Sequence, residues 1–202
     1  MFALVESGSI TKMLNGRKGI TIDGVQHPQQ IFTIWTESER NAIGIYTVEM
    51  DESKRKDDKW YINTNITYAF SGGKVTGSYG DATAKAHADT LWTAQDESDG
   101  KGTEGEVATE GLKTKLIRTI KSQAEGELNK TDWYVVRKSE ESTAIPSAVT
   151  THRKAVRSKQ AAMETSITNA SDTPALETLY TYTKQEDGSI TRPLGEIPVK
   201  EF

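Results

Sequence analysis

The composition of the chain changes near Asp81, and this change limits its possible folds more than any other feature of its 202 residues. Up to about Gly80, short runs of β-branched and aromatic residues alternate with glycine turns, a pattern typical of strands. From Asp81 to about Ala170, the helix-favouring residues Ala, Leu, Lys, Glu and Gln prevail. The change predicts an α+β protein with a β-rich part followed by a helical part.

We expect three parts: a small antiparallel β module over residues 1–80, a helical hairpin or bundle over 81–185, and an extended C-terminal tail over 186–202. The tail contains two prolines and two glycines and needs a surface on which to lie. The alternative is a single mixed domain in which the helices cover one face of a sheet.

Three turns in the N-terminal part predict β-hairpins. Ser7-Gly8, Asp23-Gly24 and Gly72-Gly73 each separate two short apolar runs, and glycine tolerates the backbone angles of tight turns. Thr36 and Glu39 have the spacing of a capping box, which predicts the start of a short helix.

Apolar residues recur at helical spacing in the C-terminal part. One helix is expected over residues 82–95, and a second over residues 107–128, where every fourth residue from Leu112 to Leu128 is apolar. A later helix is expected to start at Pro146. Its apolar residues lie seven positions apart, at Val149, Val156 and Met163.

The segment Thr131-Asp132-Trp133 predicts a structural anchor between these helices. Thr131 or Asp132 can accept a hydrogen bond from a first-turn amide, and we expect Asp132 to be the cap. We expect Trp133 to be a core side chain that anchors the hairpin, because large aromatic residues contribute most to small cores. The same role is expected for Trp35, Trp60, Trp92 and Tyr134.

The net charge of −4 gives no overall reason to bind nucleic acid or an anionic membrane. Charge is nevertheless uneven along the chain. Asp96 to Glu110 is acidic, whereas no acid lies between Glu141 and Glu164. We interpret the basic residues of that second stretch as a partner-binding surface, although two solvated faces or an internal pairing also fit. The residues are Arg153, Lys154, Arg157 and Lys159, with Arg153 and Arg157 as the strongest candidates.

No residue pattern indicates catalysis, a metal or a cofactor. The chain has no cysteine, its three histidines are scattered, and it lacks nucleophile-elbow, phosphate-loop and dinucleotide-binding motifs. Residues 96–106 match part of a calcium-loop template, but Gln95 stands where an acid is expected. We therefore expect a protein that is not an enzyme and that binds no metal.

The N-terminal apolar run ends at Glu6 without a preceding basic region, so no signal peptide is expected. No apolar run is long enough to cross a bilayer, and we expect a soluble protein. The absence of cysteine fits a reducing cytoplasm and an extracellular particle equally well.

Two segments carry a resemblance to phage proteins. Thr131-Asp132-Trp133, followed by Ile145-Pro146 and by His152-Arg153-Lys154-Ala155-Val156-Arg157, resembles the helical hairpin of phage tail-assembly and tail-fibre-assembly chaperones. That family shows a Thr/Ser-Asp-Trp turn and an aromatic-Arg-x-x-Leu-Arg helix, and His152 and Val156 replace its tyrosine and leucine here. The opening ten residues and Gly44-Ile45-Tyr46-Thr47-Val48 are similar to the small N-terminal β module of phage tail-associated proteins.

The resemblance implies a non-enzymatic protein that binds a phage tail fibre or another tail protein within an oligomeric assembly, without a cofactor, nucleic acid or membrane. It implies a location in the virion tail, or in the host cytoplasm during assembly. A transient chaperone and a retained virion component both remain open. The alternatives are a phage or host regulatory protein that binds nucleic acid through the basic helix 146–163, and an enzyme with an unrecognised acidic site.

Overall fold

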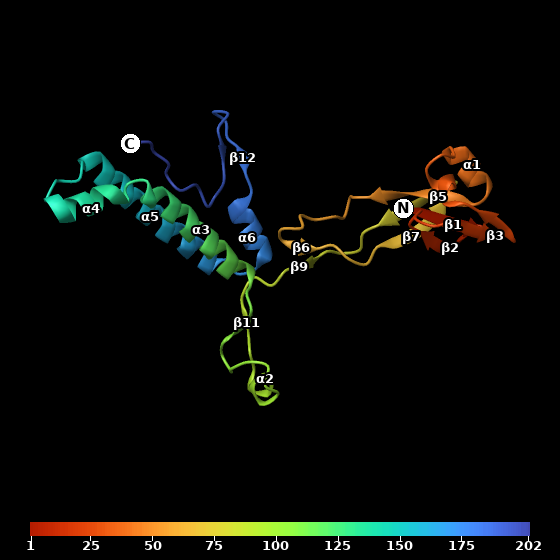
Figure 1. Cartoon of the computed structure of the whole chain (residues 1–202), viewed down its shortest axis with the longest axis horizontal. Coiled ribbons are helices and arrows are strands. Elements are labelled where there is room, and N and C mark those ends of the chain that lie inside the picture. The colour runs from red at the N-terminus through yellow and green to blue at the C-terminus, as the bar shows by residue number, and fades with distance from the viewer. The chain divides into compact units, whose positions relative to one another are not determined.

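The computed structural model describes residues Met1–Phe202, which divide into two compact units, Met1–Thr83 and Ala84–Phe202 (Figure 1). The first unit consists mainly of strands and the second mainly of helices. The α+β class expected from the sequence is therefore confirmed.

The first unit contains a five-stranded sheet in the order β2-β1-β5-β8-β7. Its strands are β1 (Phe2–Glu6), β2 (Ser9–Leu14), β5 (Ile45–Asp51), β7 (Thr67–Ser71) and β8 (Lys74–Ser78). Between β2 and β5 the chain forms β3 (Ile20–Ile22), β4 (Val25–His27), a 3-10 turn η1 (Gln29–Phe32) and α1 (Glu37–Ala42). Two short strands complete the unit, β6 (Tyr61–Ile62) and β9 (Thr83–Ala84), the latter at its boundary. The three expected hairpins are confirmed as β1–β2, β3–β4 and β7–β8.

The sheet is mixed, so the expectation of an antiparallel module was wrong in this respect. Strands β5 and β8 run parallel, with Val48 opposite Val75 and Asp51 opposite Ser78. A hairpin turn fixes the pairing of its own two strands, but it does not decide which of them joins a third strand. Here β8, the second strand of its hairpin, lies beside β5 and therefore points in the same direction.

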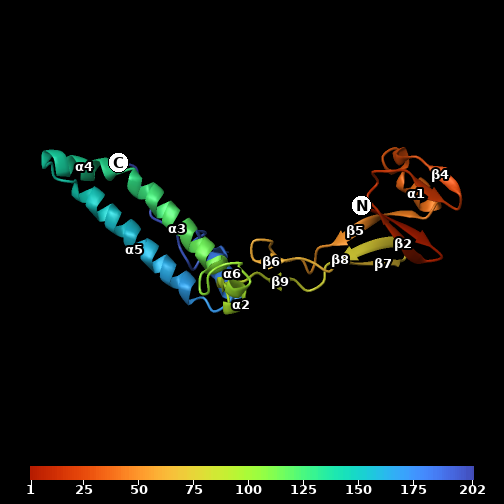
Figure 2. The ribbon, with the colours of Figure 1, turned by 60° about the horizontal axis from the view of Figure 1, so that its bottom comes forward.

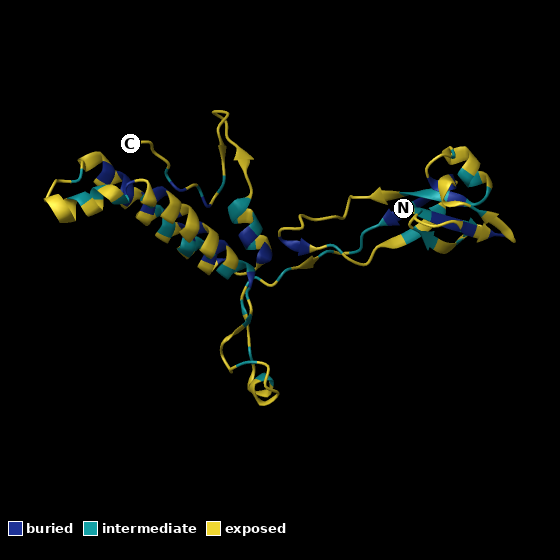
Figure 3. Cartoon of the chain, viewed as in Figure 1, coloured by how far each residue is buried: buried dark blue, intermediate teal, exposed yellow.

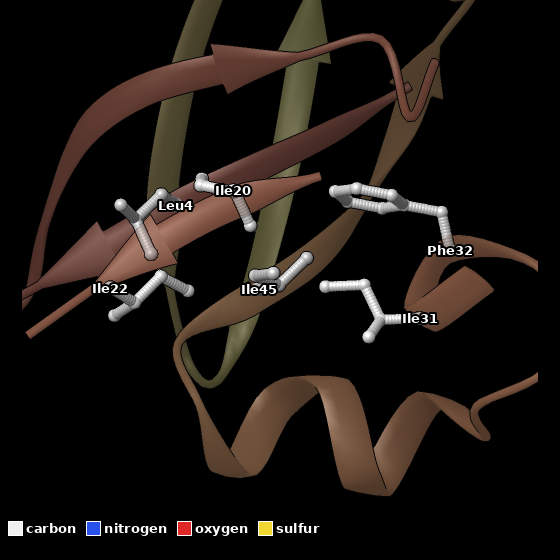
Figure 4. Close-up of a cluster of buried hydrophobic side chains, with 6 residues drawn as sticks. All are labelled: Leu4, Ile20, Ile22, Ile31, Phe32 and Ile45. Atoms are coloured by element: carbon white, nitrogen blue, oxygen red, sulfur yellow. The ribbon is translucent and has the colours of Figure 1, made fainter. Parts of the chain in front are cut away.

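Six buried side chains from β1, β3, η1 and β5 form the core of the first unit, and Figure 4 shows them converging. They are Leu4, Ile20, Ile22, Ile31, Phe32 and Ile45. Trp35 packs against this cluster and is only partly buried. The expected capping box is confirmed, because Thr36 and Glu39 exchange hydrogen bonds at the start of α1.

The second unit is built around two long helices, α3 (Leu112–Asn129) and α5 (Ser147–Asn169), which pack side by side (Figures 1 and 2). The shorter α4 (Asp132–Glu141) connects them at one end, and α6 (Thr173–Tyr180) follows α5. Buried residues alternate with exposed ones along both long helices (Figure 3). The stripes are confirmed at Leu116, Ile120, Ala124, Val149, Val156 and Met163, which are all buried. Leu112 and Leu128, at the two ends of the stripe predicted for α3, are only half-buried.

Residues 82–95 do not form the expected helix. Strands β10 (Thr90–Leu91) and β11 (Val107–Thr109) pair instead, and the chain between them carries α2 (Ala94–Ser98). Helix propensity alone is a weak signal, and this segment has no apolar stripe to bury. We name residues 90–110 the acidic arm, which projects from the start of α3 in Figure 1.

The base of the acidic arm is fixed to α3 by Asp89. Its carboxylate accepts hydrogen bonds of 2.7 Å from the amide of Gly111 and from the hydroxyl of Thr114. Gly111 also lies so close to the chain at Ala88 that an added Cβ would be 2.3 Å from the Ala88 carbonyl. The arm therefore starts from a defined position at the end of α3.

The C-terminal tail begins with a hairpin rather than an extended chain, because β12 (Thr183–Lys184) pairs with β13 (Ile190–Thr191). The following residues are extended, and Leu194 and Ile197 are buried among the helices. The amide of Leu194 donates to the carbonyl of Leu179 over 3.0 Å. None of the helices combines the length and the apolar character that a membrane crossing requires.

Candidate docking site at the tip of the helical hairpin

Arg153 lies inside the turn between α3 and α4 rather than on an open surface. Only 8% of the residue is exposed. Its Nη1 atom lies 2.8 Å from the carbonyl oxygen of Leu128, 2.8 Å from Oγ1 of Thr131 and 2.7 Å from a carboxylate oxygen of Asp132. The Leu128 carbonyl belongs to the last turn of α3, where carbonyls have no partner within the helix. Arg153 therefore ties this turn to α5, and its charge faces the protein interior.

Thr131 and Asp132 anchor the turn, but by a different arrangement from the expected cap. Thr131 is fully buried, and its hydroxyl donates to the Leu128 carbonyl and accepts from Arg153. Neither side chain caps α4, since Thr131 makes no capping hydrogen bond and Asp132 lies within the first helical turn. An acid at that position still favours the N-terminus of α4 electrostatically.

Trp133 is not a core side chain, so the expected role as hairpin anchor was wrong. It is 51% exposed, and its ring stacks on Tyr134 with the guanidinium of Arg137 4.6 Å from the ring centre. Helix α4 buries none of its residues, and Val135 and Val136 are 43% and 53% exposed. The outer face of α4 is an uncovered apolar surface.

The other expected aromatic anchors differ in burial. Trp60 is buried at 3% exposure, whereas Trp35, Trp92 and Tyr134 are only partly buried. Trp92 lies in the acidic arm, where its indole packs against the backbone of Gly102.

A buried acid and histidine form a second polar cluster that sequence reasoning missed. Oε1 of Glu127 lies 2.9 Å from Nε2 of His152, and both side chains are less than a tenth exposed. The carboxylate also accepts from the Nζ of Lys130 at 2.8 Å and from the amide of Lys200 at 2.9 Å. The ring of Phe202 lies 5.2 Å from the imidazole, so the end of the tail covers the pair.

Burial by itself raises the pKa of the Glu127 carboxyl. The hydrogen bonds from Lys130, Lys200 and His152 together outweigh burial and leave the pKa below its usual value. A signal for this cluster was present in the sequence. A stripe drawn at every fourth residue ends at Leu128, but the true helical period of 3.6 residues brings Glu127 onto the buried face.

A groove of about 580 Å³ lies between α4 and the first half of α5. Apolar and basic side chains line it together: Val135, Ile145, Thr150, Arg153, Lys154, Arg157 and Ser158. Lys154 and Arg157 are exposed and make no ion pair in the structure. The groove therefore presents two free positive charges beside uncovered apolar side chains.

The four basic residues predicted to form one surface lie in three different places in the structure. Arg153 is buried in the turn, and Lys154 and Arg157 face the groove. Lys159 lies outside the groove. Its Nζ atom contacts the tail at Gly195, where a Cβ added to the glycine would be 2.3 Å from that Nζ. Only Lys154 and Arg157 combine exposure with a position on the groove.

The geometry gives no constellation for metal-dependent chemistry. No three His, Cys, Asp or Glu side chains lie together in a way that would hold a metal ion. In the calcium-like segment, Gln95 donates to Asp99, and Nζ of Lys101 lies 3.1 Å from Asp96 and 3.0 Å from Asp99. What the groove can do is hold a segment that is both apolar and acidic, because its lining offers contacts of both kinds.

Comparison with family models, with curated proteins and with solved structures finds no match to this chain. The resemblance to phage tail-assembly proteins therefore stays a prediction that depends on the residues themselves.

Proposed function

We propose that this chain is a non-enzymatic tail or tail-fibre-associated protein of a tailed phage, and that it binds other tail proteins through the groove between α4 and α5. The observation that supports the proposal best is the pairing of uncovered apolar side chains with unpaired cations at one place. Val135 is 43% exposed and lines the groove together with Ile145, Lys154 and Arg157.

Apolar side chains that gather at one place on a surface mark an interaction site, whereas those scattered singly need no explanation. The cations add direction, because charges at an interface orient an acidic partner and exclude a basic one. A protein that holds a partner in this way needs no cofactor and no catalytic residue. Both roles implied by the resemblance, transient chaperone and retained component, are compatible with such a groove.

Quantitative mass spectrometry of purified phage particles and of infected-cell extracts tests the function. A fixed copy number relative to the major tail protein indicates a retained component. Absence from particles, together with a complex with a tail protein in the extract, indicates a chaperone. Absence from particles and from every complex with tail proteins would refute the proposal.

Charge reversal at the groove tests the site. We expect Arg157→Glu to leave the far-ultraviolet circular dichroism spectrum unchanged and to weaken binding to the tail protein at least about tenfold, since loss of one interfacial charge pair costs about 1.4 kcal/mol or more. Lys115→Glu is the matched control, because Lys115 is an exposed lysine of α3 that does not line the groove. Equal affinities for Arg157→Glu and the parent protein would remove the groove from the interface.

A further inference from the structure

We propose that the groove binds the acidic arm of a second copy of this chain, so that copies associate head to tail. The inference builds on the proposed docking role of the groove and names one occupant for it. The arm and the groove lie in the same unit, and their chemistry is complementary in both charge and apolar contacts.

The acidic arm carries more negative charge than it neutralises. From Asp96 to Glu110 the chain has six acids and one lysine. Lys101 pairs with Asp96 and Asp99, and Arg118 pairs with Glu110. Three exposed acids remain without an ion pair: Glu97, Glu104 and Glu106. They are the counterpart of Lys154 and Arg157 at the groove.

The arm also exposes apolar side chains next to these acids. Leu91 and Val107 lie opposite each other in the β10–β11 pair and are 50% and 47% exposed. The groove offers Val135 and Ile145 as apolar partners. Docking would cover apolar side chains on both molecules, which is the main favourable term in protein association.

The arm is already ordered before it meets a partner. Thr93 and Asp96 form a capping box at the start of α2, and Asp89 holds the arm base through two hydrogen bonds. The hydrogen bonds from the Thr93 hydroxyl and amide, with that from Lys101, lower the pKa of Asp96 to about 2, so its carboxylate stays charged. A segment that is ordered in advance loses little conformational entropy on binding.

The positions of the arm and the groove favour binding of the arm of a second molecule over binding of the arm of the same chain. The arm starts at the N-terminal end of α3, while the groove lies towards its C-terminal end, where Arg153 contacts the Leu128 carbonyl. The 18 residues of α3 span about 27 Å from one end of the helix to the other. In Figure 1 the arm also projects away from α3 and α5.

Each chain then has one arm and one groove to offer, and the contact joins two different surfaces. Such a contact leaves a free arm and a free groove at the two ends of every dimer. Copies continue to add until the arrangement closes into a ring, or they form an open chain.

Sedimentation velocity of the full-length protein tests this inference with two double variants. Lys154→Glu/Arg157→Glu reverses the charge of the groove, and Glu104→Gln/Glu106→Gln neutralises the arm. We expect the parent protein to form larger species as its concentration rises, and each double variant alone to remain a monomer. An equimolar mixture should form a one-to-one complex and nothing larger, because only one intact arm and one intact groove remain.

The mixture also shows that the variants are folded, since a misfolded variant would not restore binding. A parent protein that stays monomeric at all concentrations would overturn the inference. It would equally fail if either variant associated as the parent does, or if the mixture formed no complex.

These outcomes are separable from a failure of the proposed function. If the parent is monomeric but Arg157→Glu abolishes binding to a tail protein, the groove has another occupant and only this inference falls. If the copies associate through the groove while no tail protein binds, the proposed function falls instead.

Discussion

Replacing Arg153 with methionine should destabilise the second unit, because the buried guanidinium holds the turn between α3 and α4 to α5. The substitution removes the hydrogen bonds from Nη1 to the carbonyl of Leu128 and to the hydroxyl of Thr131, both 2.8 Å long. It also removes the ion pair with Asp132. Methionine is similar in length and fills much of the same space, so the change isolates the polar contacts.

The expected loss follows from the environment of each contact. Hydrogen bonds from a charged donor contribute about 1.5–3 kcal/mol, and a buried acceptor left unpaired costs about 1–3 kcal/mol. The Leu128 carbonyl keeps the hydroxyl of Thr131 as a partner, which moderates the loss. The side chain of Asp132 is 51% exposed, so its ion pair adds at most about 1 kcal/mol. Removing the cation also relieves its desolvation cost, and we expect a net loss of about 3 kcal/mol.

Urea unfolding followed by far-ultraviolet circular dichroism is the appropriate assay, because α3 and α5 supply most of the helical signal. Arg157→Met is the matched control, since it makes the same substitution on the same helix at an exposed position. We expect it to change the free energy of unfolding by no more than about 0.5 kcal/mol. Equal unfolding midpoints for the two variants, at equal slopes, would refute the structural position assigned to Arg153.

Three further predictions concern stability. The pKa of Glu127 lies below its reference value of 4.5 because three hydrogen bonds outweigh burial. The contribution of this carboxylate to stability is therefore present above about pH 4.5 and is lost as the pH falls through the folded-state pKa. Urea unfolding at several pH values should show a weaker acid dependence for Glu127→Gln than for the parent. Ile120→Ala should cost about 2–5 kcal/mol in the same assay, because Ile120 is 1% exposed and its removal leaves a cavity. Trp133→Ala should cost about 1 kcal/mol or less, because half of the residue is exposed.

Each of the three has an outcome that contradicts it. An acid dependence that is unchanged in Glu127→Gln would mean that other carboxyls account for it. A cost below about 1 kcal/mol for Ile120→Ala would mean that the packing of α3 on α5 is loose. A loss of several kcal/mol for Trp133→Ala would restore that residue to the role of anchor.

Much of the fold could be predicted because its signals lie within a few residues of one another. The hairpins follow from glycine turns between apolar runs. Helix α3 follows from apolar residues at every fourth position, and α5 follows from the repeat at Val149, Val156 and Met163, which the structure buries. The prediction of a helix over residues 82–95 was wrong because it depended on helix-favouring composition alone. The segment has no stripe of apolar residues that a helix could bury. A local preference that has no core to bury it does not determine a helix.

The site could be predicted only in part. The sequence by itself identified a basic stretch, an acidic stretch and a turn at Thr131 and Asp132. Only the tertiary structure decided that Arg153 is enclosed while Arg157, four residues later, faces a groove. The enclosing groups are Leu128, Thr131 and Asp132, which lie 21 to 25 residues earlier in the chain.

The same division holds for the remaining differences. Turn residues determined which strands form hairpins, but the packing of the whole sheet decided that β8 lies parallel to β5. The apolar period determined the buried faces of α3 and α5, but the absence of any covering element left Trp133 exposed on α4. Backbone preferences and periodicity are local properties and can be read along the chain. Burial of a given charge or ring depends on which distant residues surround it, and therefore only the folded structure determines it.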